Sequence, residues 1–333
     1  MKIIVDAMGG DNAPLEILKG CSLAQKEYGI DLVLTGNKEI IEKTICENNI
    51  ELSNYEIIHT DIEISMHDEP TCVIKDKKES SLGKAFSLLK QGAGDAVVSA
   101  GSTGAVLVGG TMTVGRIRGI KRPALATLLP SDFGPAMLMD CGANVECRPE
   151  MLLQFGIMGS IYMNKIIGVE NPRVMLANVG TEDTKGGPLQ KEAFELFKGS
   201  DLNFKGNIEG RDILSGITDV IIADGFSGNL ILKTCEGVAG MMYANLKQVF
   251  KRNFISKLAA ALVMSGLKQF KKKLDYTEYG GAPLMGISKP VIKAHGSSNA
   301  VAFKNALRQA CEYCKNDVIS EIQNSVSKIK EVE

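Results

Sequence analysis

The chain has 333 residues, of which 44% are hydrophobic and 23% are charged, with 38 Lys plus Arg against 39 Asp plus Glu. This composition is typical of a globular protein with a substantial core, and it excludes a wholly disordered chain. The net charge of −1 and the absence of Trp argue against nucleic acid as a partner, because they leave no general basic surface and few base-stacking platforms.

Continuous apolar runs of strand length recur along the chain, as expected for strands that are buried on both faces. They cover residues 2–8, 30–36, 55–60, 95–101, 123–129, 136–142, 173–180 and 219–225. Helix-like stretches lie at 14–28, 38–49, 81–92, 103–116, 150–167, 187–198 and 301–330. This alternation predicts βαβ units and an α/β fold with a largely parallel sheet. Since no linker or low-complexity tract divides the chain, we expect a single domain over residues 1–333.

The segment 227–275 departs from this alternation, because it has a helical pattern without strands. Within 245–275, apolar residues at helical spacing are surrounded by lysines and arginine, and Asp275 is the only acid. Such a basic amphipathic subregion indicates contact with a membrane surface or an acidic protein. The alternative is a helical hairpin packed on a second subunit, with its lysines in solvent. The residues predicted to make the contact are Lys251, Arg252, Phe254, Leu258, Leu262 and Lys271.

Several features predict a cytoplasmic protein. The eight cysteines lack the spacing of a disulfide framework or a zinc site, and we interpret Cys311 and Cys314 as ordinary helix residues. The chain opens on a strand-like run rather than on a charged and then apolar leader. The longest apolar run, 258–267, is about half of the roughly 18 residues that a membrane span needs.

The first predicted strand ends in DAMGGDNAP, in which Asp6 and Asp11 flank two glycines. Carboxylates at the carboxyl end of a strand can bind substrate hydroxyls, a base or a metal. They can equally be turn and cap residues, and we interpret Asp11 as a cap. Asp6 is a candidate substrate-binding residue.

The run DAVVSAGSTGAVLVGG has the order strand, glycine turn, helix. Glycines allow a ligand to approach the backbone closely, and the free N–H groups of a first helical turn favour an anion. The alternative is a tight turn in which Ser or Thr caps the helix. The candidate phosphate-binding residues are Ser99, Gly101, Ser102, Thr103 and Gly104.

Three further turns carry polar residues at predicted strand ends. In ANVGTEDTKGG, Asn178, Glu182 and Lys185 form a cluster in which the lysine could hold phosphate, although a solvated ion pair is the alternative. ADGFSGNLILKTCEG repeats the strand–glycine–helix order. Its candidate residues are Asp224, Gly228, Asn229 and Lys233. In KAHGSSNA, His295 lies in a Gly/Ser turn before the last helical pattern. No activated Ser or Cys nucleophile is visible, which favours a phosphate-type ligand that reacts directly.

Eight motifs in this order, across roughly residues 2–305, resemble one family. They are DAMGGDNAP, SAGSTGA, LMDCGAN, NVGTEDTKG, GNIEGRDI, DGFSGNLILK, YGGAPLMG and KAHGSSNA. The family is the bacterial phosphate acyltransferase of phospholipid synthesis, the acyl-carrier-protein:phosphate acyltransferase. The family pattern often has histidine where Asn12 stands and asparagine where Ser102 stands, so neither an imidazole at 12 nor an amide at 102 is essential here.

The resemblance implies transfer of a fatty acyl group from acyl carrier protein to inorganic phosphate, giving an acyl phosphate for a membrane glycerol-3-phosphate acyltransferase. It also implies a three-layer Rossmann-like fold, related to phosphotransacetylases and to isocitrate/isopropylmalate dehydrogenases. A homodimer and peripheral association with the inner face of the cell membrane are expected by the same route. We also expect no metal site and no cofactor.

The predicted mechanism is direct attack of a bound phosphate oxygen on the thioester carbonyl. Residues 102–104 and Lys185 would bind phosphate, and Asn178 or Asn229 would stabilise the oxyanion. Asp224 or Glu182 would orient the lysine, and His295 could donate a proton to the leaving thiolate. Two alternatives stay open. One is a nicotinamide-dependent dehydrogenase, which the missing G-x-G-x-x-G argues against; the other is a non-enzymatic membrane scaffold that binds the carrier protein.

Overall fold

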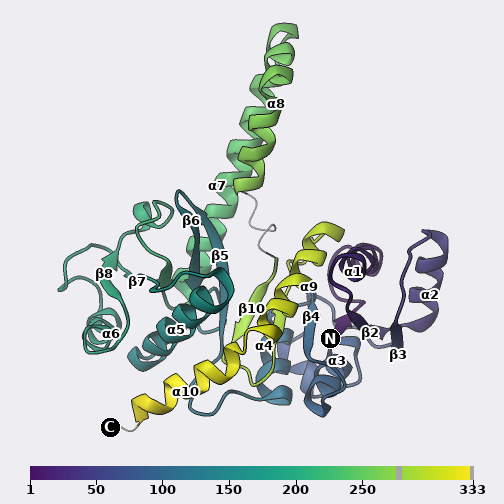
Figure 1. The fold of residues 1–333 in the computed structure, drawn as a ribbon, viewed down its shortest axis with the longest axis horizontal. Coiled ribbons are helices and arrows are strands. Elements are labelled where there is room, and N and C mark those ends of the chain that lie inside the picture. Colours follow the sequence, from purple (N-terminus) through teal and green to yellow (C-terminus); the bar gives the residue numbers. More distant parts are fainter. Residues whose placement is uncertain (275–279, 331–333) are drawn as a thin grey trace.

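A single sheet runs through the molecule in the computed structural model, which describes residues 1–274 and 280–330, with side chains up to 267 and from 280 to 327 (Figure 1). In this part of the chain the sheet has eleven strands in the order β3-β2-β1-β4-β11-β10-β5-β6-β9-β7-β8. The strands are β1 (Lys2–Asp6), β2 (Asp31–Gly36), β3 (Tyr55–His59), β4 (Ala96–Ser99), β5 (Ala124–Ser131), β6 (Gly134–Met139), β7 (Val174–Ala177), β8 (Phe204–Ile208), β9 (Val220–Ile222), β10 (Ala282–Met285) and β11 (Val291–Lys293).

Helices cover both faces of the sheet. The α-helices are α1 (Leu15–Tyr28), α2 (Lys38–Glu47), α3 (Ser81–Gln91), α4 (Thr103–Gly109), α5 (Pro149–Tyr162), α6 (Pro188–Lys198), α7 (Gly225–Lys251), α8 (Phe254–Leu274), α9 (Ala300–Lys315) and α10 (Val318–Lys330). Two short 3₁₀ segments, η1 (Pro70–Ile74) and η4 (Gly210–Asp212), and two π-helical turns, η2 (Gly110–Val114) and η3 (Met163–Ile167), complete the described elements.

The alternation of side chains along the strands produces three layers. In β1, Ile3 and Val5 face a core shared with α1 and α9, whereas Ile4 faces a second core shared with α3 and α4. The second lobe, which contains β5, β6, β7 and β9, has the same arrangement. One face of its strands packs on α5, α6 and α10, and the opposite face packs on α7. The predicted α/β fold with a largely parallel, helix-covered sheet is confirmed.

The strand direction reverses at the centre of the sheet. β10 pairs antiparallel with both neighbours, meeting the end of β11 through Ala282 and the start of β5 through Met285. β5 in turn pairs antiparallel with β6, so that Met139 at the end of β6 lies opposite Ala126. The two parallel half-sheets, β3-β2-β1-β4-β11 and β6-β9-β7-β8, therefore run in opposite directions. Their register brings the carboxyl ends of β4, β11 and β6 to the same level at this junction.

All the predicted strands are present, but three strands were missed and one connection differs from the prediction. β8, β10 and β11 have three to five residues each, which is too short for a periodic signal. The sheet was predicted to be largely parallel, and the strands predicted at 123–129 and 136–142 are an exception to that direction. They form an antiparallel hairpin, β5–β6, because only a short turn from Asp132 to Phe133 connects them.

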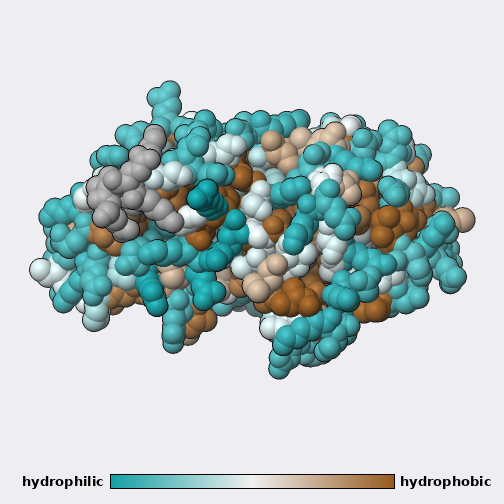
Figure 2. Space-filling view, turned by 90° about the horizontal axis from the view of Figure 1, so that it is seen from below, coloured by the Kyte–Doolittle hydropathy of each residue, from teal (hydrophilic) through white to brown (hydrophobic). Residues whose placement is uncertain are grey.

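Residues 245–274 of the predicted helical subregion form most of an antiparallel helical arm, and its last residue, Asp275, lies outside the described residues. The second half of α7 and all of α8 project from the body of the protein, as Figure 1 shows. The face on the opposite side of the molecule is mostly hydrophilic, with scattered apolar patches (Figure 2). None of the described helices is both long enough and apolar enough to pass through a membrane.

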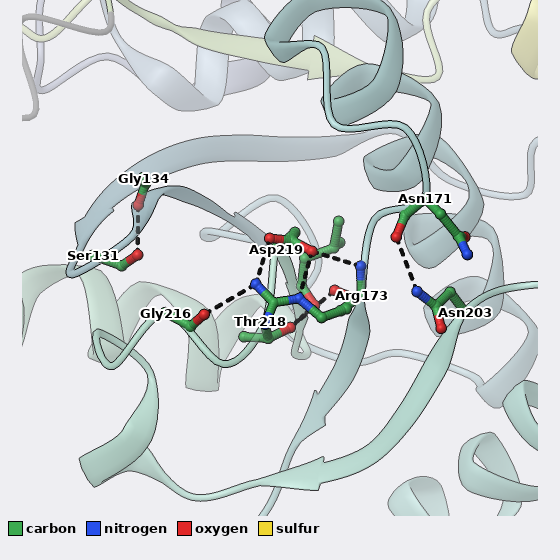
Figure 3. A network of polar contacts seen from close by, with 9 residues as sticks. Ser131, Gly134, Asn171, Arg173, Asn203, Gly216, Thr218 and Asp219 are labelled. Carbon is green, nitrogen blue, oxygen red and sulfur yellow. Dashed lines mark hydrogen bonds and ion pairs between the residues drawn. The ribbon is translucent and has the colours of Figure 1, made fainter.

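An ion pair joins the segments before β7 and β9, at the amino-terminal edge of the half-sheet β6-β9-β7-β8 (Figure 3). Arg173, just before β7, donates through its backbone N–H and guanidinium to Asp219, just before β9, and through Nη2 to the carbonyl oxygen of Gly216 at 3.0 Å. Burial alone would raise the pKa of Asp219, but the hydrogen bonds from Arg173 outweigh it and lower this pKa. The polar groups of Arg173 and Asp219 at this edge are thus paired with each other.

Candidate functional site

A cleft of about 300 Å³ lies between the two lobes at the junction of the half-sheets. One wall comes from the residues that follow β4 and end β11. The other comes from the residues that follow β6 and from the first turns of α7. The polar residues that line it are Thr103, Thr127, Asn229, Lys233, Glu236, Lys293 and His295. The cleft is therefore built from the carboxyl ends of strands in both lobes, where open α/β sheets commonly bind ligands.

The predicted Ser99–Gly104 turn forms one side of this cleft, with different roles for its members. The Ser99 hydroxyl donates to Oδ2 of Asp6 at 2.7 Å and accepts from the N–H of Gly101 at 3.0 Å. The Ser102 side chain makes no capping hydrogen bond to α4, and Thr103 lines the cleft. The turn thus presents Thr103 and the start of α4 to the cleft, while Ser99 holds the turn from behind.

Asp6 and Gly104, both predicted to bind substrate, lie beside the cleft rather than in its lining. Asp6 is 1% exposed beneath the turn, where burial raises its pKa and the hydrogen bond from Ser99 opposes the shift. A methyl group on Gly104 would lie 2.6 Å from Cγ of Pro70 in η1, so this glycine serves close packing. Both residues support the turn that carries Thr103.

Lys293 is a cleft residue that the sequence prediction missed. It ends β11, is 7% exposed, and its Nζ donates to the carbonyl oxygens of Ala100, at 3.3 Å, and Ala294. Burial lowers its pKa to about 8, against the opposing effect of the Asp6 and Asp11 charges. A lysine that ends a buried apolar strand in the run PVIKAHG was the available signal, because lysine is seldom buried without a partner.

The start of α7 contributes the opposite wall. Asp224, a predicted catalytic residue, caps this helix by accepting from the N–H of Ser227 at 2.8 Å and from its hydroxyl at 2.9 Å. Asn229, predicted to be catalytic, and Lys233, predicted to bind substrate, both line the cleft. Nζ of Lys233 lies 2.8 Å from Oε2 of Glu236, whose side chain is 18% exposed, so the two charges are paired at the cleft wall.

Asp140 holds the loop beneath this wall. This buried carboxylate, directly after β6, accepts hydrogen bonds from the backbone N–H groups of Leu125, Ala143 and Asn144 and from the Asn144 amide. Burial raises its pKa, and these hydrogen bonds act in the opposite direction. The loop it orders places Gly142 in the cleft against Asn229.

His295 lines the cleft as a partly exposed side chain, and its Nδ1 lies 2.8 Å from the Ser297 hydroxyl. Partial burial is the main cause of a pKa below the usual value for histidine. The ring is therefore mainly neutral at pH 7, with one N–H to donate and one nitrogen to accept.

The structure does not bring Asn178, Glu182 and Lys185 into the cleft. They follow β7, which is two strands beyond β6, and their loop is closed on itself. The Asn178 amide donates to the carbonyl oxygen of Lys185 at 3.1 Å, and Nζ of Lys185 lies 3.7 Å from the Glu182 carboxylate. Both charged side chains are about half exposed or more. This geometry matches the solvated ion pair that the sequence left open, and a role for Lys185 in phosphate binding stays a prediction.

The residues predicted to contact a membrane or carrier protein lie on the arm. Phe254 is 80%, Leu258 58% and Leu262 83% exposed, an unusual density of exposed apolar side chains. Lys251 and Arg252 are exposed at the tip between α7 and α8. Lys271 belongs to α8, but its side chain lies outside the described residues.

Comparisons with known proteins identify similar chains of nearly the same length. A family model described as "Fatty acid synthesis protein" matches residues 1–321. The chain is 47% identical over 329 residues to a phosphate acyltransferase of Alkaliphilus oremlandii, covering 99% of this chain and 98% of that protein. It is 46% identical over 332 residues to a phosphate acyltransferase of Clostridioides difficile, again covering 99% and 98%.

Solved structures of phosphotransacetylases share the fold. The match to the enzyme of Streptococcus pyogenes has a TM-score of 0.60 at 16% identity and covers 97% of this chain and 93% of that one. The match to a phosphotransacetylase of Staphylococcus aureus has a TM-score of 0.61 at 14% identity and covers 97% and 94%. The predicted relation to the phosphotransacetylase fold is confirmed.

The contact between α7 and the Asp140 loop gives a stability prediction. A methyl group on Gly228 would lie 1.9 Å from the backbone oxygen of Asp140, so Gly228→Ala must push the cleft wall apart. We expect a loss of about 1–3 kcal/mol in the free energy of unfolding, measured by urea denaturation. Gly237→Ala in the same helix is the control, because nothing lies within 4 Å of its added methyl group. It should be stabilising by up to about 1 kcal/mol. Equal effects of the two changes would contradict this packing.

Proposed function

The chain belongs to the bacterial phosphate acyltransferase family, and from that premise we propose that it transfers a fatty acyl group from acyl carrier protein to inorganic phosphate in the cleft. The observation that carries the proposal is the grouping of two lysines, two threonines, an asparagine and a histidine in a cleft lined by both lobes. The acyl phosphate product would supply a membrane glycerol-3-phosphate acyltransferase. The relatives do not favour the dehydrogenase or the scaffold.

Phosphate would bind between the two walls. Lys293 and Lys233 supply positive charge from opposite lobes, and the Thr103 hydroxyl and the first N–H groups of α4 supply further donors. Lys233 also pairs with Glu236, so a bound dianion would compete with that carboxylate for the lysine. The Ser99, Gly101 and Asp6 group would keep the donors in place.

The reaction follows from the position of the bound anion. A phosphate oxygen uses a lone pair to form a C–O bond with the thioester carbonyl carbon, and the carbonyl electrons move onto oxygen. Asn229 can donate to this oxyanion from the cleft wall. When the oxyanion collapses, the C–S bond breaks and the thiolate leaves. His295 is the candidate proton donor: its neutral ring can accept the proton that the attacking hydrogen phosphate loses and pass it to the thiolate. Each step uses groups of the chain and the two substrates, so we propose that no cofactor takes part.

The arm would contact the carrier protein that brings the acyl donor and the membrane that receives the product. Its lysines and Arg252 suit an acidic carrier protein, and its apolar side chains suit an anionic bilayer. We place membrane contact first, because Phe254, Leu258 and Leu262 are so widely exposed. A homodimer that uses part of the arm belongs to the same proposal. The enzyme would then work in the cytoplasm, at the inner face of the membrane.

A thiol-release assay tests the proposed function. The full-length protein is incubated with acyl-acyl carrier protein, with and without inorganic phosphate, and free thiol is measured. We expect release to depend on phosphate and to produce acyl phosphate in equal amount. Carrier binding without phosphate-dependent release would support the scaffold instead. A change in the absorbance of a nicotinamide cofactor would support the dehydrogenase.

Lys293 gives a pH prediction. A lysine with a pKa of about 8 carries its charge below that pH, so kcat/KM for phosphate should fall as the pH rises through about 8. Lys293→Met should lower this value about 10- to 100-fold at pH 7 and remove the fall. Lys289→Met is the control, because Lys289 also donates to a carbonyl, that of Leu89 at 2.8 Å, but lies outside the cleft lining. An unchanged pH profile in Lys293→Met would disprove this role. Lys185→Ala in the same assay tests the prediction that Lys185 binds phosphate.

The membrane contact is tested with Leu258→Glu. Adding a charge to the exposed apolar side of α8 should reduce co-sedimentation with anionic liposomes several-fold. Val301→Glu makes a similar change at a 51% exposed position on α9 and should bind like the unchanged protein. Undiminished binding of Leu258→Glu would rule out this membrane contact.

A further inference from the structure

An apolar groove of about 240 Å³ lies beside the cleft, between α7 and the far end of β5. Its floor includes Leu129 and Pro130 of β5 and Leu214 from the segment before β9. Its other side is a stripe along α7 that includes Val238, Ala239 and Met242. Thr234, Cys235 and Glu236 complete its lining, and of these three Glu236 also lines the cleft.

The groove and the cleft share a wall. Leu232 and Glu236 line both of them. On β5, Leu125 and Thr127 line the cleft and Leu129 lines the groove. All three point to the same face of the sheet, because side chains alternate along a strand. These four residue steps span about 13 Å, so one face of β5 leads from the polar site into the apolar one.

The chemistry changes along this path. Lys233, paired with Glu236, stands at the cleft end. Beyond them the lining is almost entirely aliphatic, with Val238 45% and Met242 43% exposed along the open side. A ligand that fits both sites has a polar head that reacts with an anion in the cleft and a long hydrocarbon tail in the groove. The tail is stabilised there because burial against apolar side chains removes it from water.

We propose that this groove holds the hydrocarbon chain of the acyl donor. The thioester carbonyl lies in the cleft beside Asn229, and the chain runs along β5 towards Met242. The inference rests on the proposed acyl transfer and adds to it the site that selects chain length. The α7 wall of the groove continues into the arm beyond Met242, so the chain would enter and leave near the surface that carries the exposed apolar residues.

Ala239→Trp tests the groove, because Ala239 is a half-buried helix position where a large side chain would fill the space. The assay is phosphate-dependent thiol release from a butyryl and a palmitoyl donor on the same carrier protein. The unchanged protein should prefer the longer donor, since each buried methylene is worth about fourfold in kcat/KM. In Ala239→Trp, kcat/KM for the palmitoyl donor should fall at least about tenfold, with the butyryl value kept within about twofold. Ala244→Trp, at an exposed position on the same helix, should leave both values unchanged.

The outcomes separate the two proposals. No phosphate-dependent release from either donor in the unchanged protein would mean that the proposed function fails. Release without chain-length preference, or an equal loss for both donors in Ala239→Trp, would contradict the proposed acyl-chain groove and leave the proposed function unaffected. An equal loss accompanied by a change of oligomeric state would assign the groove to contact with a second copy of the chain. Retained butyryl activity shows that the variant is folded, and Val238→Gln, which makes the groove polar without filling it, should weaken the palmitoyl donor selectively.

Discussion

The reversal of strand direction at β10 and β5 determines where this protein can hold a ligand. In a uniformly parallel sheet, every carboxyl end would lie along one edge. Here the two half-sheets run in opposite directions, and the register of β11, β10, β5 and β6 brings their carboxyl ends level at the junction. Loops from two lobes therefore meet across one cleft, and charges that each lobe could not gather alone are placed together.

Each lobe supports its wall of the cleft with a buried carboxylate at a strand end. Asp6 accepts from Ser99 and holds the turn that precedes Thr103, and Asp140 accepts four hydrogen bonds and holds the loop that carries Gly142. Donors surround the buried Asp140 carboxylate, so its loop has little freedom to move, and the Asp6 carboxyl ties the opposite turn through Ser99. The cleft is consequently preorganised, as the proposed positioning of phosphate requires.

One helix connects the proposed steps. α7 begins at the cleft with Asn229 and Lys233, lines the apolar groove through Met242, and continues into the arm. Its 27 residues span about 40 Å, so the same rigid element reaches from the phosphate site to the surface proposed to meet the membrane. A hydrophobic product formed at the cleft would have an apolar path towards that surface, where its consumer is expected.

The sequence by itself determined the long strands, the helices that separate them, the glycine turns at strand ends and the amphipathic arm. These features depend on the period of apolar residues and on local backbone preferences, which neighbouring residues encode. Only the tertiary structure decided which turns share a site. Lys293 resembled an ordinary strand residue, and Lys185 lay in a turn as promising as that of Lys233. Lys293 reaches the cleft because β10 pairs with both β11 and β5, which joins residues more than a hundred positions apart in the sequence. Lys185 does not reach it because β9 lies between β6 and β7. Strand order and register follow from the packing of the whole core, and the local periodicity of apolar residues does not encode them.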